Sequence, residues 1–189
     1  IFTGSGNRSF SAGADIKDFE SHRYDSNSSN IYSQAFDGAL DEIEALPAPA
    51  ISMIQGICVG GGFELSMATD IRIAAQGSKF GIPVAKLGIL VGYREMKRLV
   101  NLVGPGNANY ILLSGRIIGD TEALEMGMIT KLVEESELER SVIDLAREMV
   151  PLAPLSQSRH KKILQSVIAN QSLKGFTLEE TNLPFKKDS

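Results

Sequence analysis

The stretch Ala50-Ile51-Ser52-Met53-Ile54-Gln55-Gly56-Ile57-Cys58-Val59-Gly60-Gly61-Gly62-Phe63-Glu64 decides the fold, because it leads from an apolar strand through a glycine run into a helix. Residues 50–54 are a short apolar run, which is typical of a buried strand. The glycines at 60–62 let other groups approach the backbone closely, because they carry no Cβ. We therefore predict a strand, a tight glycine turn, and a helix over residues 63–69 with Glu64 in its first turn.

A second loop of small residues lies upstream, Ser11-Ala12-Gly13-Ala14-Asp15-Ile16. Backbone N–H groups that already point at a carbonyl oxygen stabilise the negative charge that develops on it in a transition state. A helix N-terminus adds unsatisfied N–H groups and a positive dipole end. The two loops together predict such a pair of donors, with Glu64 beside them as an acid or base. The alternative is a tight turn followed by a glutamate that complements the helix dipole.

Further segments follow these two loops in order along nearly the whole chain, and together they resemble the crotonase, or enoyl-CoA hydratase/isomerase, superfamily. The matching segments are residues 10–17, 56–70, 80–83 (Phe-Gly-Ile-Pro), 86–89 (Lys-Leu-Gly-Ile), 98–99, 103–104 and 123–127 (Ala-Leu-Glu-Met-Gly).

The resemblance implies a role for particular positions in this chain. The N–H groups of Ala14 and Gly61 correspond to the oxyanion hole for a CoA thioester, and Glu64 corresponds to the first of two catalytic glutamates. It also implies coenzyme A as part of the substrate, with no covalently bound cofactor. No metal is expected either, because no cluster of histidine and cysteine has metal-ligand spacing. The residues expected to line the substrate channel and the acyl pocket are Ala12, Asp15, Ile16, Gly60, Pro83, Val84, Leu87 and Leu90.

The second family glutamate belongs immediately after Pro83, where this chain has Val84. Hydration needs one group to activate water and another to protonate the α carbon, and valine can do neither. A second departure follows at Tyr93, Arg94 and Glu95, where hydratases tend to have small residues. Either one of these side chains supplies the missing polar function, or Arg94 and Glu95 form a solvated first helical turn.

Three functions follow from these residues. The leading one is enoyl-CoA hydration or isomerisation through an enolate; with one carboxylate, isomerisation or decarboxylation of a malonyl-type thioester is chemically easier. The second is a catalytically weakened CoA-binding or scaffold paralogue. The third is a peptidase, because Clp-type proteases share this spiral fold. Such an enzyme needs a nucleophile with a base in reach, and Ser11, Ser52 and Ser66 have no obvious histidine partner.

Composition is ordinary for a globular enzyme domain. The chain has 189 residues, 43% of them hydrophobic and 22% charged, and a net charge of −4. This charge gives no reason to expect nucleic acid as a partner. No apolar run is long enough to span a membrane, and the first residues lack the basic region of a secretory signal. We therefore expect a cytoplasmic protein. The single cysteine, Cys58, excludes an internal disulfide and is expected to be a small buried residue at a strand end.

Strands that alternate with helices predict an α/β layer fold. The resemblance adds a crotonase-like spiral of ββα units over residues 1–150, with the first β unit apparently missing. It also adds a helical C-terminal trimerisation region over residues 151–189, and hence a homotrimer or a dimer of trimers. Lys161 is expected either to contact CoA phosphates of a neighbouring subunit or to be solvated. Beyond the glycine turn we expect a loop over 21–30, helices near 31–46, 95–102, 107–113, 136–150 and 156–169, and strands over 71–75 and 128–133.

Overall fold

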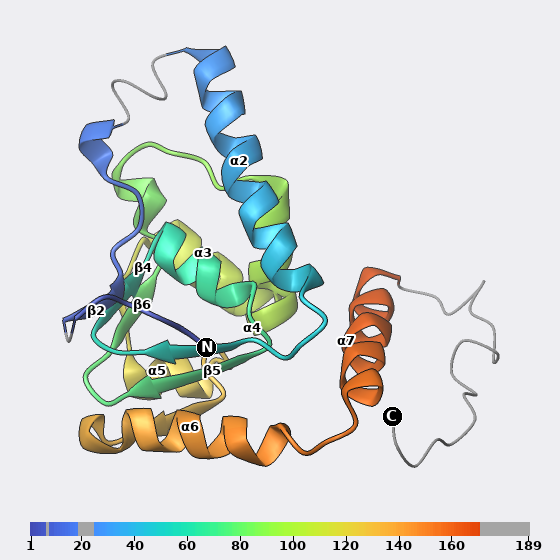
Figure 1. Ribbon diagram of the computed structural model, residues 1–189. Coiled ribbons are helices and arrows are strands. Elements are labelled where there is room, and N and C mark those ends of the chain that lie inside the picture. The colour runs from blue at the N-terminus through green and yellow to red at the C-terminus, as the bar shows by residue number, and fades with distance from the viewer. Residues whose placement is uncertain (7, 19–24, 171–189) are drawn as a thin grey trace.

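The computed structural model of the protein describes residues 1–6, 8–18 and 25–170, in which eight short strands form two sheets. The first sheet has the order β1-β3-β5-β8, and the second has the order β2-β4-β6-β7 (Figure 1). The strands are β1 (Phe2–Thr3), β2 (Ser9–Ser11), β3 (Ile51–Ile54), β4 (Ile57–Val59), β5 (Ile71–Ala75), β6 (Lys79–Gly81), β7 (Ile118–Gly119) and β8 (Lys131–Val133).

From β1 to β6, strands come in consecutive pairs whose members join different sheets, and a helix follows each pair. The last two strands, β7 and β8, also join different sheets, but α5 lies between them. All pairings are parallel except that of β6 with β7, which is antiparallel. The units β3-β4-α3 and β5-β6-α4 thus each add one strand to each sheet. This arrangement confirms the predicted α/β spiral of ββα units. The division at residue 150 and the role of the C-terminal region in trimerisation stay predictions.

Helices cover the sheets and connect their strands (Figure 1). They are α2 (Ser26–Ala45), α3 (Gly61–Met67), α4 (Tyr93–Ser114), α5 (Asp120–Glu125), α6 (Leu138–Met149) and α7 (Pro154–Ala169), with 3-10 turns η1 (Ile16–Asp18), η2 (Pro83–Lys86) and η3 (Glu135–Glu137). Gly104 interrupts α4 with φ 75° and ψ 165°. The two helices expected on either side of this glycine therefore form one element with a kink.

Helix α2 begins earlier than the sequence indicates. Asp25 caps it: Asp25 Oδ1 accepts the N–H of Ser28 at 2.7 Å, and the Asp25 N–H is bonded in return by Ser28 Oγ at 3.2 Å. The predicted loop over 21–30 is therefore wrong for residues 26–30, while 21–24 lie outside the described residues. The reason is a reciprocal capping box, which satisfies backbone donors at the helix start.

The starts of α3, α4, α6 and α7 also differ from the prediction by two residues, and α3 and α4 begin early, at Gly61 and Tyr93. Ser136 lies in η3 and does not cap the following helix, because α6 begins at Leu138 after Glu137. Pro154 begins α7 two residues before the predicted start, in the first turn, where a missing N–H costs nothing. In the part of the chain that the structure describes, every helix is too short or too polar to cross a bilayer.

The core lies between the second sheet and the helices α3 and α4. Phe63 of α3 and Phe80 of β6 are fully buried, and their rings meet edge to face with centroids 6.1 Å apart. Cys58 is fully buried in the same cluster, as predicted. This packing fixes α3, and with it the glycine turn from which α3 begins.

Candidate active site

The two loops of small residues pack backbone against backbone. A Cβ added to Gly13, which has φ +91°, would lie 3.1 Å from the amide nitrogen of Gly61 and 3.2 Å from the carbonyl oxygen of Val59. A Cβ added to Gly62 would lie 2.4 Å from the carbonyl oxygen of Ser11. Glycine is therefore required on both sides of this contact, and the loops predicted to supply two N–H donors are adjacent.

The turn at Gly60 sets Gly61 and Glu64 beside each other. Gly60 adopts φ 54°, its N–H donates to the carbonyl oxygen of Gly81 at 2.8 Å, and its own carbonyl oxygen accepts the N–H of Glu64 at 3.0 Å. Gly61 is the first residue of α3, where N–H groups have no partner within the helix. The N–H group of Gly61 and the carboxyl group of Glu64 thus lie in the same helical turn, just after the end of β4.

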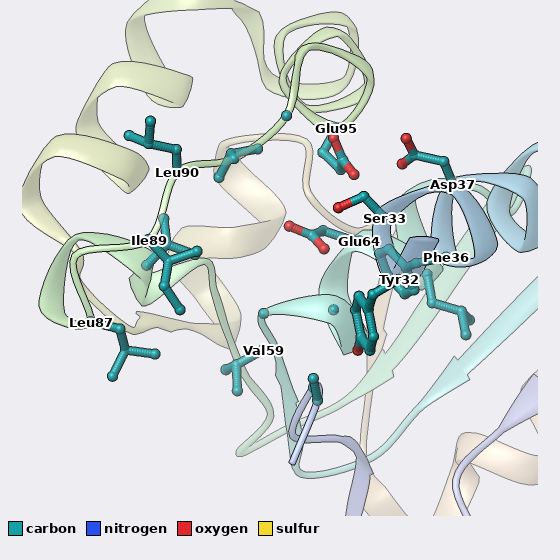
Figure 2. Close-up of a pocket in the computed structure, with 18 of the residues that line it drawn as sticks. Tyr32, Ser33, Phe36, Asp37, Val59, Glu64, Leu87, Ile89, Leu90 and Glu95 are labelled. Atoms are coloured by element: carbon teal, nitrogen blue, oxygen red, sulfur yellow. The ribbon is translucent and has the colours of Figure 1, made fainter. Parts of the chain in front are cut away.

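A pocket of about 830 Å³ opens where these loops meet α2 and the segment after β6 (Figure 2). Of the residues predicted to act on or bind substrate, all except Asp15 line it. The carboxylate of Asp15 instead accepts the N–H of Lys17 at 3.0 Å. The catalytic and binding roles of these residues stay predictions. The predicted residues in the lining are Ala12, Ala14, Ile16, Gly60, Gly61, Glu64, Pro83, Val84, Leu87 and Leu90.

The expected apolar acyl wall is split between the inside of the pocket and its mouth. Val84 is half-buried in η2, and its carbonyl oxygen accepts the N–H groups of Leu87 and Ile89 at 2.9 and 3.1 Å. Leu87 is 51% exposed and Leu90 is 93% exposed. The segment after Pro83 therefore folds back on Val84, and its leucines form a rim.

Four side chains of α2 also line the pocket, and none of them was predicted to do so. They are Tyr32, Ser33, Phe36 and Asp37, and Figure 2 places them across the pocket from the segment 87–90. Their spacing is the available signal, because Tyr32 with Phe36 and Ser33 with Asp37 are pairs four residues apart on one helix face. In the helix predicted near 31–46, Leu40 is deeply buried, at 1% exposure, whereas Phe36 is half-buried in the pocket lining.

Glu95 is not solvated, which corrects one of the two readings of residues 94 and 95. It is 9% exposed and lines the pocket from the first turn of α4. Burial raises the pKa of its carboxyl group, and a hydrogen bond to the Asp37 side chain together with the charge of Asp37 raises it further. Arg94 is exposed, as that reading expected, and forms an ion pair with Asp41.

Arg98 holds α2 against α4. Its Nη2 lies 2.6 Å from Asp41 Oδ1, and its Nε lies 2.7 Å from Glu44 Oε1. The Arg98 side chain is 9% exposed, whereas the side chains of Asp41 and Glu44 are 47% and 37% exposed. These charge-assisted bonds position α2, and thus the pocket face that carries Asp37.

The structure offers no support for a nucleophilic serine or for a metal site. Ser52 and Ser66 are fully buried and bonded, Ser52 to the Thr69 hydroxyl at 2.9 Å and Ser66 to the Phe63 carbonyl oxygen at 2.8 Å. The Ser11 hydroxyl accepts the N–H of Gly13 at 3.2 Å. Within residues 1–6, 8–18 and 25–170, no group of three histidine, cysteine or acidic side chains could hold a metal ion.

Comparison with known proteins agrees with this geometry. The family model of enoyl-CoA hydratase/isomerase matches residues 1–188. A crotonyl-CoA hydratase of Syntrophomonas wolfei is 39% identical over 161 residues, which are 82% of this chain and 59% of the relative. A short-chain-enoyl-CoA hydratase of Clostridium acetobutylicum is 35% identical over 165 residues, 87% of this chain and 62% of the relative. The chain thus spans about three fifths of the length of these curated relatives.

Solved structures give the same result. The structure of an enoyl-CoA hydratase/carnithine racemase from Magnetospirillum magneticum superimposes with a TM-score of 0.91 at 33% sequence identity. The match covers 95% of this chain and 67% of that one.

Proposed function

Because the chain belongs to the enoyl-CoA hydratase/isomerase family, we propose that it binds an acyl-CoA thioester and stabilises the enolate form of its acyl group. The observation that carries this proposal is the close contact of Gly13 with Gly61, one helical turn from Glu64. Two loops that meet so closely can direct two backbone N–H groups at one oxygen.

In the proposed mechanism the thioester oxygen accepts hydrogen bonds from the N–H groups of Ala14 and Gly61. Donors that are in place before the reaction stabilise the oxyanion more than the ground-state carbonyl, and this difference lowers the barrier. Glu64 exchanges a proton with the substrate or with the attacking water. The pocket volume of about 830 Å³ accommodates an acyl group together with the thioester end of the cofactor portion.

Hydration of a 2-enoyl-CoA is the leading reaction. The two curated relatives are named as hydratases of crotonyl-CoA and of short-chain enoyl-CoA, and the pocket has a second buried carboxyl group in Glu95. Decarboxylation of a malonyl-type thioester, or isomerisation of a double bond, is the second candidate. Val84 favours it, because one carboxylate can handle the single proton of these reactions.

We also propose that the protein acts in the cytoplasm as a homotrimer or a dimer of trimers, with residues 151–189 at the subunit contacts. Apolar side chains on α7 support this proposal, since Leu164, Val167 and Ile168 are about half exposed in the single chain. Sedimentation of the full-length protein tests it. A monomer at micromolar concentration would contradict the assembly.

The experiment for the reaction uses the full-length protein that contains this chain. It is incubated in heavy water with enoyl-CoA and malonyl-type thioesters, and the products are read by mass spectrometry. Gain of water identifies a hydratase, whereas loss of carbon dioxide or a shifted double bond without hydration identifies the second candidate. Binding without any conversion would indicate a CoA-binding paralogue.

The matched pair of variants is Glu64→Gln and Glu139→Gln. We expect Glu64→Gln to bind thioester but to lose about 10²–10⁴-fold in turnover, the usual contribution of a positioned acid or base. Glu139 is exposed on α6 and does not line the pocket, so the same substitution there leaves turnover unchanged. Unchanged turnover in Glu64→Gln would remove this residue from the mechanism.

A further inference from the structure

Glu95 occupies a site in the pocket that a single glycine keeps open. It is the third residue of α4, and its side chain turns back over Gly92, the residue before the helix. A Cβ added to Gly92 would lie only 2.5 Å from Glu95 Oε2. The carboxyl group therefore sits where any other residue at position 92 would displace it, and it faces the pocket instead of the solvent.

Two oxygen atoms at this point lack hydrogen-bond partners among the residues that the structure describes. Glu95 Oε2 and Asp37 Oδ1 are both buried and unbonded when the two groups are treated as carboxylates. Figure 2 shows these two side chains turned toward each other at the top of the pocket. Because two carboxylates cannot bond to each other, a single shared proton satisfies both oxygens at once.

Burial and the neighbouring charges favour the proton on Glu95. Burial and the facing Asp37 both disfavour a second negative charge there, while Arg98, on the next turn of α4, only partly offsets them. Arg98 is bonded to Asp41 and Glu44 of α2 through Nη2 and Nε, while its buried Nη1 has no partner among the described residues. The exposed Arg94 is paired with Asp41. The remaining acidic group of the pocket is Glu64, on α3.

A structural role does not account for Glu95. The contact between α2 and α4 already has Arg98 bonded to Asp41 and Glu44, at 2.6 and 2.7 Å. A buried carboxyl pair that needs a proton to be satisfied adds cost to the fold, and such groups in native proteins call for a functional reason. The position of Glu95 in the lining of a pocket that lacks the family's second glutamate supplies that reason.

We infer that Glu95 is the second acid of the pocket, with Asp37 as its partner, and that it performs the proton transfer for which Val84 is unsuited. This inference rests on the proposed function and adds a residue to it. In hydration, the water oxygen bonds to C3 of the enoyl group while Glu64 takes a proton from that water. The C2=C3 electron pair moves through the enolate to form a C–H bond at C2 with the proton of Glu95.

Atoms balance in this scheme, because the substrate gains one hydroxyl and one hydrogen. Glu64 ends protonated and Glu95 ends ionised, and exchange with solvent returns both to their starting states. Asp37 is a positioning residue, because it acts on the substrate only through Glu95. Asp37 also raises the pKa of Glu95, and this favours the return of the proton to Glu95 after each turnover.

The test is Glu95→Gln in the full-length protein, because glutamine keeps the shape of a protonated glutamate and still donates a hydrogen bond to Asp37. Two activities are measured, hydration of crotonyl-CoA and exchange of the C2 hydrogens of butyryl-CoA with heavy water. The exchange requires the oxyanion donors and the group that carries the C2 proton, which is Glu95 in this scheme. We expect hydration and exchange both to fall by about 10²–10⁴-fold, with the KM for crotonyl-CoA within about threefold of wild type.

The outcomes separate this inference from the proposed function. Hydration within about threefold of wild type in Glu95→Gln would overturn the inference and leave the proposed function standing. Exchange within about threefold of wild type in Glu95→Gln would also overturn it, because another group then moves the C2 proton. If the wild type neither hydrates crotonyl-CoA nor exchanges butyryl-CoA hydrogens, the proposed function itself fails.

An independent measurement reports the shared proton without any turnover. Infrared difference spectra of wild type against Glu95→Gln at neutral pH should contain the C=O stretch of a protonated carboxyl group, shifted in heavy water. Asp37→Asn removes the partner charge and leaves the acid in place, so it should reduce hydration less than Glu95→Gln does. A spectrum with only carboxylate bands would contradict the assignment of the proton to Glu95.

Discussion

Lys161 Nζ lies 2.8 Å from Asp70 Oδ2, and this ion pair joins α7 to the turn that follows α3. The same oxygen of Asp70 accepts the N–H of Ala50 at 2.7 Å, just before β3. A solvated side chain was one of the two expectations for Lys161. That expectation is wrong for the single chain, because the Lys161 side chain is only 9% exposed. Asp70 thus links α7, the turn after α3 and the start of β3.

Loss of this ion pair should loosen α7 without disturbing the pocket. In Lys161→Met, we expect the docking of α7 to weaken by about 1.5–3 kcal/mol, the usual contribution of a hydrogen bond to a charged group. The measurement is amide hydrogen exchange, which should become faster in α7 and stay unchanged in β3 and β5. The control is Lys162→Met, because Lys162 is exposed. Equal protection of α7 in both variants would contradict the role of the ion pair.

The contact between Gly13 and Gly61 predicts a large effect of a single methyl group. In Gly13→Ala, the added Cβ would meet the Gly61 nitrogen at 3.1 Å, in a backbone conformation with φ +91° that alanine rarely adopts. The two donor loops must then separate, and we expect kcat to fall by about 10²–10³-fold, as for loss of one oxyanion donor. Steady-state kinetics with crotonyl-CoA measure the effect.

The control for this substitution is Gly77→Ala. Gly77 also has a positive φ, +84°, but nothing lies within 4 Å of the added Cβ, and the residue is not in the pocket lining. Both variants therefore carry the same kind of backbone strain, and only Gly13→Ala pushes the two loops apart. A similar loss of kcat in both would mean that general destabilisation explains the effect.

The two small-residue loops that meet at the pocket were predictable from sequence because each is encoded in a few consecutive residues. The run Gly60-Gly61-Gly62 and the segment around Gly13 indicate close backbone approach by their composition alone, and Glu64 follows at a fixed helical offset. The pair of Asp37 and Glu95 was not predictable in this way. It depends on how α2 packs against α4, and a charged residue in a first helical turn is more often exposed.

The start of α2 was missed for a different reason. The residues Asp25-Ser26-Asn27-Ser28-Ser29-Asn30 have the composition of a turn, because short polar side chains hydrogen-bond their own backbone. The same property makes Asp25 and Ser28 a capping box once the helix forms. Composition alone does not separate these outcomes, and the packing of Leu40 in the core favours the helix.

The raised pKa of Glu95 predicts how stability depends on pH. A carboxyl group whose pKa is higher in the folded state binds its proton more tightly when folded. The protonation of Glu95 therefore stabilises the fold fully below the ordinary pKa of 4.5. This stabilisation is lost as the pH rises through the pKa that Glu95 has in the folded protein. Urea unfolding of wild type from pH 4.5 upward should show this loss, and Glu95→Gln should lack that part of it. Parallel curves for the two proteins would contradict the raised pKa.

Cys58 should be inert in the folded protein. Its thiol is fully buried, and burial raises its pKa to about 12, so the reactive thiolate is scarce at neutral pH. We expect a thiol reagent such as dithionitrobenzoate to leave native protein unlabelled and to label one thiol per chain in denaturant. Rapid labelling without denaturant would show that the strand end around Cys58 opens.

Val84 offers the sharpest test of how the pocket handles its second proton. It is half-buried, lines the same pocket as Glu64, and occupies the position of the second family glutamate. If Glu95 performs the missing transfer, Val84→Glu should restore hydration to a Glu95→Gln protein, because a carboxyl group again faces the substrate. We expect the double variant to recover about tenfold or more of the lost rate, a modest share of what an acid contributes.

The matched control is Val84→Gln in the same Glu95→Gln background. Glutamine has the size and polarity of glutamate but cannot donate a proton to carbon, so this protein should stay as slow as Glu95→Gln alone. Equal recovery in both double variants would indicate that shape or polarity at position 84 limits the rate. Recovery with glutamate alone would show that the position of the second acid can move from η2 to α4 while the oxyanion loops and Glu64 stay in place.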